Sequence, residues 1–204
     1  MPYRSTDRTR QKKDAKRTAM MQAAVRVFAD KGYQSATIRD IVDAAGVAVG
    51  TFYFYFPDKE TLFVYLYDET ADFLLQAIQQ ALRGRATLPK QFSTAIQAYF
   101  NIGVFDPAIV HLILIGGVGA VPALVEKQAE YRKSLVQIWQ QPLDRALEKG
   151  LIPEQNTRRS AEALAGAIDE VILNLLDHPD PQEELQSAIK DITQFALWAV
   201  GFRG

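Results

Sequence analysis

Two short amphipathic segments on either side of a glycine constrain the fold more than any other feature of this sequence. They lie in TIRDIVDAAGVAVGTFYFYFPDKETL, residues 37–62. Thr37 and Asp40 have the spacing of a capping box, which predicts a short helix over residues 38–45. Gly46 suits the left-handed residue that ends a helix, and a further short helix is expected from about Ala48 to Phe54. This arrangement predicts a helix-turn-helix unit.

The remainder of the chain also favours helices. Apolar residues recur three and four positions apart, and no alternating stretch of strand length stands out. A first helix is expected from near Asp14 to Gly32, and later helices should begin near Lys59, Leu88, Pro107, Pro122, Thr157 and Pro181. The helix from Pro122 is expected to bend at Pro142. The sequence therefore predicts an all-α protein of about nine helices, with an N-terminal three-helix unit and a larger C-terminal helical domain.

The residue inventory excludes several classes of function. Of the 204 residues, 48% are hydrophobic and none is cysteine, which is typical of a folded protein without disulfides, thiolate catalysis or a cysteine zinc site. The two histidines are far apart and no HExxH or GxSxG motif is present, so we expect no metal, no cofactor and no enzymatic activity. The longest apolar tract, Ile109 to Leu124, falls short of the roughly 20 residues that span a bilayer, and no secretory signal is visible. We expect a cytoplasmic protein with no membrane partner.

Charge is distributed unevenly along the chain. Residues 1–59 hold 11 Lys and Arg against 6 Asp and Glu, whereas residues 60–204 hold 12 against 18. The N-terminal part should therefore attract polyanions, although a solvated basic tail gives the same excess. We divide the chain into a flexible basic arm over residues 1–13, a helix-turn-helix domain over residues 14–58 and a helical domain over residues 59–204.

The third expected helix has a start that is free of bulky side chains. Its first residues are Ala48, Val49, Gly50 and Thr51. Small residues there let a helix approach base edges in a major groove about 12 Å wide. Tyr53 and Tyr55 supply hydroxyl groups that can reach phosphate oxygens, and Lys59 adds a positive charge at the start of the next helix. These residues predict a DNA-binding surface.

The aromatic run from Phe52 to Phe56 has a second interpretation. Five consecutive aromatic residues are also typical of a buried core segment. The flanking motif favours the surface for Tyr53 and Tyr55, because their hydroxyl groups can bind phosphate. The phenylalanines carry no such group, so we expect them in the core.

Fifteen positions in fixed register carry a likeness to a known family. They are Gly32, Thr37, Ile38, Ile41, Ala45, Gly46, Val47, Gly50, Thr51, Tyr53, Tyr55, Phe56, Lys59, Glu60 and Leu62. Through them residues 14–66 resemble the DNA-binding region of the TetR/AcrR family of bacterial one-component transcriptional regulators. The rest is similar only in length and helicity. The resemblance implies a homodimer on a palindromic operator, most often a repressor, that a small molecule in the C-terminal domain releases from DNA.

The resemblance also implies a role for each matching position. Thr37, Tyr53, Tyr55 and Lys59 would contact phosphates, and residues 48–51 would lie nearest the bases. Ala48 stands where the family often has Ser or Thr, so the side-chain cap of that helix, worth about 1 kcal/mol, is missing. Val49 offers an apolar surface suited to a thymine methyl group, which makes Arg39 the candidate long donor to DNA.

For dimerisation we expect the last two helices, which could pair with their two-fold mates as a four-helix bundle. The candidate contacts are apolar residues spaced along both helices: Leu164, Val171, Leu175, Phe195, Trp198 and Phe202. The alternative is that some of them face the core of their own protomer.

For the effector, the resemblance implies a mostly apolar pocket within the helical domain. Its candidate lining is Phe63, Tyr67, Phe100, Phe105, Leu112, Trp139, Ile168 and Ile172, with Asn101, His111, Tyr131 and Asp169 as polar anchors. A satisfied core histidine is the alternative for His111. The stretch from Gly166 to Glu170 is similar to relatives that respond to long-chain acyl-CoA, so we expect a hydrophobic effector such as a lipid thioester.

Two other functions stay open. An effector-independent architectural DNA-binding protein would be uniformly basic, which the acidic residues 60–204 oppose. A helical protein-interaction module would use the aromatic run to bind protein. Sequence-specific, salt-dependent DNA binding that a small molecule releases would distinguish a regulator from both.

Overall fold

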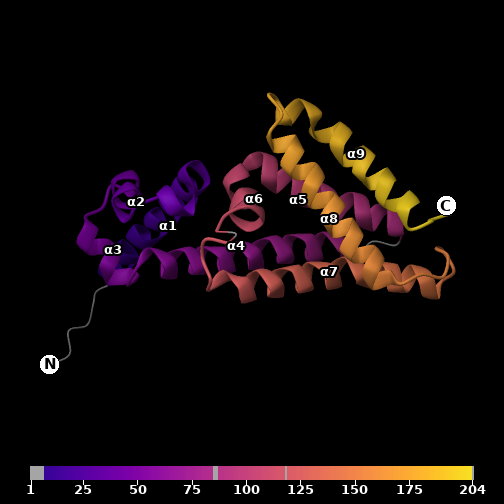
Figure 1. Ribbon diagram of the computed structural model, residues 1–204, viewed down its shortest axis with the longest axis horizontal. Helices are drawn as coiled ribbons and strands as arrows, with labels where there is room; N and C mark the ends of the chain where they lie inside the picture. Colours follow the sequence, from indigo (N-terminus) through magenta and orange to yellow (C-terminus); the bar gives the residue numbers. More distant parts are fainter. Residues whose placement is uncertain (1–6, 85–86, 118, 204) are drawn as a thin grey trace.

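The chain forms an all-α protein, as predicted. The computed structural model describes the backbone of residues 7–84, 87–117 and 119–203, and the side chains from residue 15 onward within those ranges. Over these residues there are nine helices and no strands (Figure 1). The helices are α1 (Asp7–Ser35), α2 (Ile38–Ala45), α3 (Val49–Tyr55), α4 (Lys59–Leu82), α5 (Leu88–Phe105), α6 (Pro107–Leu114), α7 (Leu124–Glu148), α8 (Thr157–Leu176) and α9 (Pro181–Ala199).

Helix α1 begins earlier than the sequence indicated. Its backbone is helical from Asp7, so the expected start near Asp14 is wrong, and residues 7–13, assigned to a flexible arm, are helical. Residues 1–6 of that arm lie outside the described residues. Gly32 has φ 72° and ψ 160°, so the regular helix is interrupted there, where the glycine predicted its end.

The helix-turn-helix unit forms as predicted. The Thr37 hydroxyl accepts the Asp40 backbone N–H at 3.1 Å, and the Asp40 carboxylate accepts the Thr37 backbone N–H at 2.9 Å, which completes the capping box of α2. Gly46 ends α2 in the left-handed conformation, with φ 64° and ψ 35°. Ala48 is the N-cap of α3 and makes no side-chain hydrogen bond there, as its methyl group dictates.

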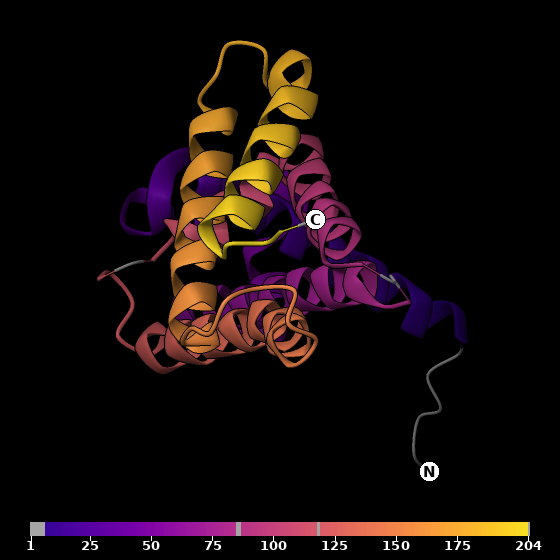
Figure 2. The same ribbon diagram turned by 90° about the vertical axis from the view of Figure 1, so that its right-hand side faces the viewer.

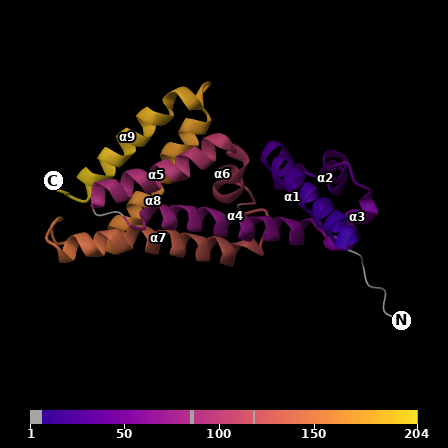
Figure 3. The same ribbon diagram turned by 180° about the vertical axis from the view of Figure 1, so that it is seen from behind.

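Helix α4 joins the N-terminal unit to the larger helical body. Asp58 caps it by accepting the Thr61 backbone N–H at 2.7 Å, as its position predicted. The helix contacts α1 at one end and runs between α5 and α7 at the other (Figures 1 and 3). A movement of α4 within the body would therefore carry α1–α3 with it.

The C-terminal body packs α5 to α9 around the far part of α4. Helices α8 and α9 form an antiparallel pair on one side of it (Figure 2). Thr157, expected as the cap of α8, is its first helical residue; Asn156 is the cap and accepts the Arg159 backbone N–H at 3.0 Å. Helix α7 begins at Leu124 rather than Pro122 and contains the buried Pro142.

One hydrophobic core extends from α1 through to α9. It joins the two units, because Phe28 of α1 and Phe63 of α4 are both buried in it. Among the described helices, no single one is both long and apolar enough to cross a membrane. Helices α5 and α6 reach that length and apolarity only together, and they are bent by 106°.

Candidate functional site

The start of α3 forms an exposed tip with little side-chain bulk. Ala48 and Gly50 are exposed, Val49 is 45% exposed, and Thr51 is partly covered. A Cβ added at Gly50 would meet nothing within 4 Å, so the backbone there faces open space. The four residues predicted to lie nearest the bases are therefore together on one accessible surface.

The aromatic run divides between this surface and the core. Phe52 and Phe56 are buried at 0% and 4% exposure, as expected. Tyr53 is 57% exposed, as expected for a hydroxyl that reaches out of the protein, and Tyr55 is partly buried. Phe54 contradicts the expectation of a core position, because it is 65% exposed. Seven residues of helix cannot turn all five rings toward one core.

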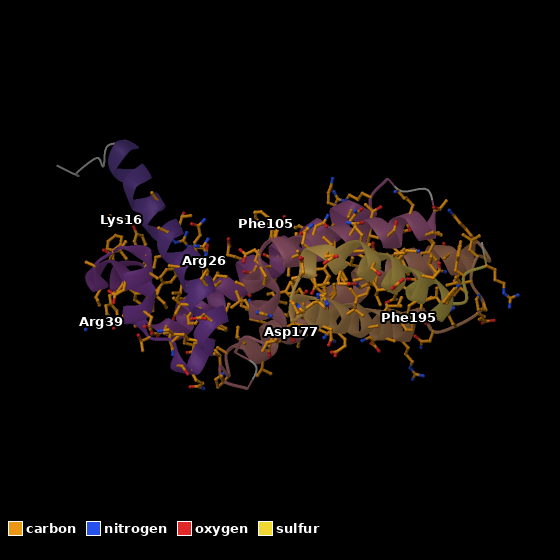
Figure 4. The ribbon with its side chains drawn as sticks, turned by 90° about the horizontal axis from the view of Figure 1, so that it is seen from above. Lys16, Arg26, Arg39, Phe105, Asp177 and Phe195 are labelled. Atoms are coloured by element: carbon orange, nitrogen blue, oxygen red, sulfur yellow. The ribbon has the colours of Figure 1, made fainter. Side chains whose placement is uncertain are left out.

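Arg39, the candidate long donor, lies on the outer face of α2. Figure 4 shows it at the outer end of the N-terminal unit, with Lys16 and Arg26 along α1. Its side chain is 85% exposed, and among the described residues it makes only a long ion pair with Asp43, at 3.8 Å. Such an exposed pair is worth little, so Arg39 can turn toward a phosphate or a base at small cost.

Thr37 has an intramolecular role that the phosphate prediction did not include. Its hydroxyl donates to Asp40 Oδ2 at 2.8 Å while accepting the Asp40 backbone N–H. Asp40 also accepts from the Lys31 ammonium at 2.8 Å. The Lys31 bond and then the Thr37 bonds lower the Asp40 pKa to about 2. This cluster ties the end of α1 to the start of α2.

Lys59 is held by the fold in a way that sequence reasoning missed. Its ammonium donates to Tyr33 O at 2.7 Å and Ala36 O at 2.8 Å, and it lies 4.3 Å from the centre of the Tyr33 ring. Burial lowers the Lys59 pKa. The ammonium therefore stabilises the connection between α1 and α2. No local signal could have indicated this, because the acceptors lie 23 and 26 residues away.

The predicted effector residues fall into separate groups. Most are buried in the body: Phe63, Tyr67, Phe100, Leu112, Tyr131, Trp139, Ile168, Asp169 and Ile172. Asn101 is exposed and Phe105 is 92% exposed, so neither faces the interior. This corrects the prediction that they line a pocket inside the body. Figure 4 shows Phe105 on the surface near the junction of the two units. His111 lines a different hollow, beside Tyr33 and Gly116.

Phe63 lies at the junction of the two units rather than deep in the body. Its ring makes edge contacts with Phe28 and Tyr33 of α1, at 4.7 and 4.9 Å between centres. From the body side, a Cβ added at Gly117 would lie 2.5 Å from Phe63 Cε1. The loop after α6 is therefore in close contact with the ring that supports α1.

A polar cluster lies inside the body, and the sequence reasoning found only part of it. The carboxylate of Asp169 accepts from the Tyr99 hydroxyl at 3.2 Å and from Arg132 Nη1 at 2.9 Å. Burial raises the Asp169 pKa, which Arg132 and Tyr99 partly oppose. Tyr99 and Arg132 were missed. A phenol at a buried helical position requires a partner, so the spacing of Tyr99 after Phe92 and Ile96 could have indicated it.

Two tyrosines complete this polar cluster. Tyr131 is buried and packs edge-on against Tyr67, with 6.5 Å between ring centres. Burial raises the Tyr67 pKa to about 12 and raises that of Tyr131 further. The Tyr131 hydroxyl lies beside the Tyr99 hydroxyl and the Asp169 carboxylate, which both act on its pKa. The buried amide nitrogen of Gln128 has no hydrogen-bond partner among the described residues.

The predicted dimer residues are split between core and surface. Leu164 and Leu175 are buried in the core of their own protomer, and Val171 and Phe202 are partly buried. Phe195 and Trp198 of α9 are 51% and 72% exposed. Figure 4 shows Phe195 at the end of the C-terminal body that lies away from the N-terminal unit. Of the two helices predicted to form the dimer interface, only α9 exposes large apolar side chains among the described residues.

Comparisons with known proteins agree with this geometry. Residues 20–66, from α1 to the start of α4, match the family model described as bacterial regulatory proteins, tetR family. The chain is 26% identical over 154 residues to the fatty acid metabolism regulator protein of Bacillus subtilis, covering 75% of this chain and 79% of that protein.

Solved structures extend the likeness to nearly the whole chain. The fatty acid degradation regulator FadR of Bacillus halodurans has a TM-score of 0.81 at 26% identity, covering 92% of this chain and 97% of that one. The transcriptional regulator FadR of Bacillus subtilis, solved with stearoyl-CoA, has a TM-score of 0.77 at 24% identity, covering 91% and 99%. The Bacillus subtilis structure, at 24% identity, shows a likeness of fold alone. The exposed α3 tip and the capped turn before it therefore lie in the segment that matches the tetR family of bacterial regulatory proteins, in a chain whose relatives are transcriptional regulators.

Proposed function

We propose that the protein is a dimeric transcriptional repressor, not an enzyme, that acts in the cytoplasm. It binds a two-fold symmetric operator through α3 and leaves it when a fatty-acid-derived effector binds the C-terminal body. The observation that carries the DNA-binding part is the bare, accessible tip from Ala48 to Gly50, with Tyr53 exposed beside it. A helix with such a tip can approach base edges closely, while neighbouring hydroxyl and cationic groups reach phosphates.

Dimerisation follows from the symmetry of such a site. Two α3 helices on a two-fold axis must meet half-sites about one helical turn, roughly 34 Å, apart. The exposed Phe195 and Trp198 of α9 support pairing through this helix. Because α4 connects the body to α1, a small change in the body alters the separation of the two α3 helices and lowers the affinity for DNA.

The effector class has two supports. The relatives at 26% identity are named as regulators of fatty acid metabolism and degradation. The body itself combines a large apolar interior with one polar cluster around Asp169, the composition of a site for a long apolar molecule with a polar end. A protein-interaction module would need neither the polar cluster nor the bare α3 tip.

The test of DNA binding is Gly50→Glu. The new carboxylate has room in the free protein, because nothing lies within 4 Å of the added Cβ. On DNA it would meet bases and phosphates, so we expect operator affinity to fall about 100-fold or more through like-charge repulsion. Gly50→Ala is the matched control and should keep operator affinity, since Ala favours helix and adds one methyl group.

Operator binding is measured by fluorescence anisotropy on the DNA upstream of the gene, and folding by thermal unfolding. Retained operator affinity in Gly50→Glu would show that α3 does not enter the groove. Lauroyl-CoA added to the wild-type complex should release the operator, with coenzyme A as its control. If neither lauroyl-CoA nor coenzyme A releases the operator at concentrations that saturate the protein, the fatty-acid effector is excluded. The DNA-binding proposal would stand.

A further inference from the structure

A groove between α7 and α8 carries positive charge on the acidic half of the molecule. Its volume is about 410 Å³, and its charged lining is Arg132, Lys133, Arg158 and Glu162. Glu162 is paired with Arg158 at 3.1 Å, and Lys133 makes no ion pair with any described residue. Three basic residues and one acidic residue therefore line this groove, in a part of the chain that holds 12 basic against 18 acidic residues.

Arg132 connects this groove to the interior. Its side chain is 50% exposed, whereas the Asp169 side chain that it binds at 2.9 Å is only 8% exposed. Asp169 is itself fixed by the Tyr99 hydroxyl at 3.2 Å. A guanidinium has five N–H donors in a rigid fork, so one edge can hold Asp169 while the others face the groove. Tyr99 and Asp169 thus orient Arg132 toward whatever enters.

Two buried polar groups lie close to Arg132 in α7. The Gln128 amide nitrogen has no hydrogen-bond partner among the described residues, and the Tyr131 hydroxyl has only the neighbouring Tyr99 hydroxyl. The Tyr131 side chain is 94% buried, since its exposure is 6%. Its hydroxyl is close enough to Arg132 and Asp169 for both charges to act on its pKa. A buried donor with an unused N–H or O–H is costly, so these two groups are suited to an oxygen of a ligand that is held beside Arg132.

We propose that the α7–α8 groove is the entrance of the effector site, and that Arg132 binds the anionic group of an amphipathic effector there. Lys133 adds a second positive charge, and Tyr131 and Gln128 donate to a carbonyl oxygen of the effector. Asp169 and Tyr99 are positioning residues, because they act on the ligand only through Arg132. This inference rests on the proposed function insofar as it assumes an effector with an apolar chain. The anionic group can be a carboxylate or a phosphate, because both accept paired hydrogen bonds from a guanidinium.

Direct binding to the full-length protein without DNA tests the proposal. The probes are laurate, lauroyl-CoA, coenzyme A and the neutral 1-dodecanol, each titrated by calorimetry. Arg132→Lys keeps the charge but loses the fork, and Arg132→Met with Asp169→Asn removes both charges, so that no buried carboxylate is left unpaired. Arg145→Ala is the control, an exposed arginine of α7 outside the groove.

We expect both Arg132 variants to weaken binding of an anionic probe about tenfold to 100-fold, while 1-dodecanol binds as to the wild type. Asp169→Asn alone should reduce the preference for anionic over neutral probes, and added salt should reduce it too. If the affinity for laurate depends on Arg132, the anion that it binds is a carboxylate. If only the affinity for coenzyme A depends on Arg132, the anion is a phosphate of coenzyme A.

Equal affinity of the wild type and both Arg132 variants for every anionic probe would overturn the inference, even if lauroyl-CoA still releases DNA. Equal losses for 1-dodecanol and laurate would also overturn it, because they would show a structural rather than an anion-binding role. If the wild type binds no probe, the effector class itself is wrong and the inference fails with it.

Discussion

Asp40 shows how a single exposed residue can control the start of a recognition unit. Its carboxylate receives the Lys31 ammonium and the hydroxyl and backbone N–H of Thr37, so it joins α1 to α2. These bonds, the one from Lys31 first, lower its folded-state pKa from the ordinary 3.8 to about 2. A carboxylate with a lowered folded-state pKa stabilises the fold above its unfolded pKa, and this contribution is lost as the pH falls toward the folded pKa.

We predict that Asp40→Asn lowers the free energy of unfolding at neutral pH and that the deficit disappears between about pH 4 and pH 2. Denaturant unfolding at several pH values measures it. Asp43→Asn is the matched control, because it removes the same charge from the same helix, where the Asp43 carboxylate makes only the long ion pair with Arg39 within the described part of the chain. Parallel pH profiles for the two variants would contradict the assignment.

Lys59 illustrates a residue with two candidate roles. Its two hydrogen bonds to backbone carbonyl groups give it a place in the fold, and the TetR-like motif gives it a proposed phosphate contact. We predict that Lys59→Ala lowers the free energy of unfolding by about 1.5 kcal/mol, the low end for hydrogen bonds to a charged group. Lys16→Ala, an exposed lysine of α1, should leave it unchanged.

Chemical unfolding of both variants checks this prediction, and wild-type stability in Lys59→Ala would refute it. DNA binding at several salt concentrations decides the second role. If the slope of log affinity against log salt concentration falls by about one unit in Lys59→Ala, Lys59 also contacts a phosphate through its remaining N–H. An unchanged slope would assign Lys59 to the fold alone.

At the scale of helices, the loop after α6 meets the aromatic cluster that supports α1. Gly117 and Gly119 have φ values of +71° and +69°, so alanine is strained at both. Only at Gly117 would the new methyl group collide, with Phe63 Cε1 at 2.5 Å and Leu124 Cδ1 at 2.8 Å.

We therefore predict that Gly117→Ala destabilises the protein by about 1–3 kcal/mol more than Gly119→Ala, the usual cost of overpacking. Because Phe63 contacts Phe28 and Tyr33, Gly117→Ala should also change operator affinity, which Gly119→Ala should not. Unfolding curves and anisotropy titrations of the two variants measure both effects. Equal stabilities would mean that the loop yields without moving Phe63.

Helix boundaries that depend on local hydrogen bonds were predictable from the sequence. Thr37, Gly46 and Asp58 satisfy backbone groups within three residues of themselves, and the helix ends that they control lie where they were expected. The start of α8 was misassigned by one residue, since Asn156 and Thr157 are both good caps and only the packing selects Asn156.

The candidate sites were less predictable, for a physical reason. An amphipathic stripe shows that a residue is covered but not by what, so Leu164 and Leu175 were assigned to a partner and lie in their own core. The partners Arg132 and Tyr99 of Asp169 come from helices 37 and 70 residues away in sequence, which no local pattern encodes.

At the scale of the whole molecule, the proposed function needs two copies in fixed relation. A protomer presents one α3 helix and the proposed operator has two half-sites, so its affinity would depend on a dimer that holds both helices at the right spacing. The candidate surface is the outer face of α9, where Phe195 and Trp198 are exposed.

We predict that Trp198→Glu converts the protein to a monomer and weakens operator binding to the level of a single half-site. The reason is that Trp198, 72% exposed in the protomer, would become a buried aromatic contact of the kind that dominates interface energies. Sedimentation velocity measures the assembly, and anisotropy measures the binding. Phe105→Glu is the control, because it places the same charge on an apolar residue that is 92% exposed but distant from α9 in sequence. A Trp198→Glu protein that sediments as a dimer would remove α9 from the interface, and a monomer that keeps full operator affinity would remove the need for a dimer.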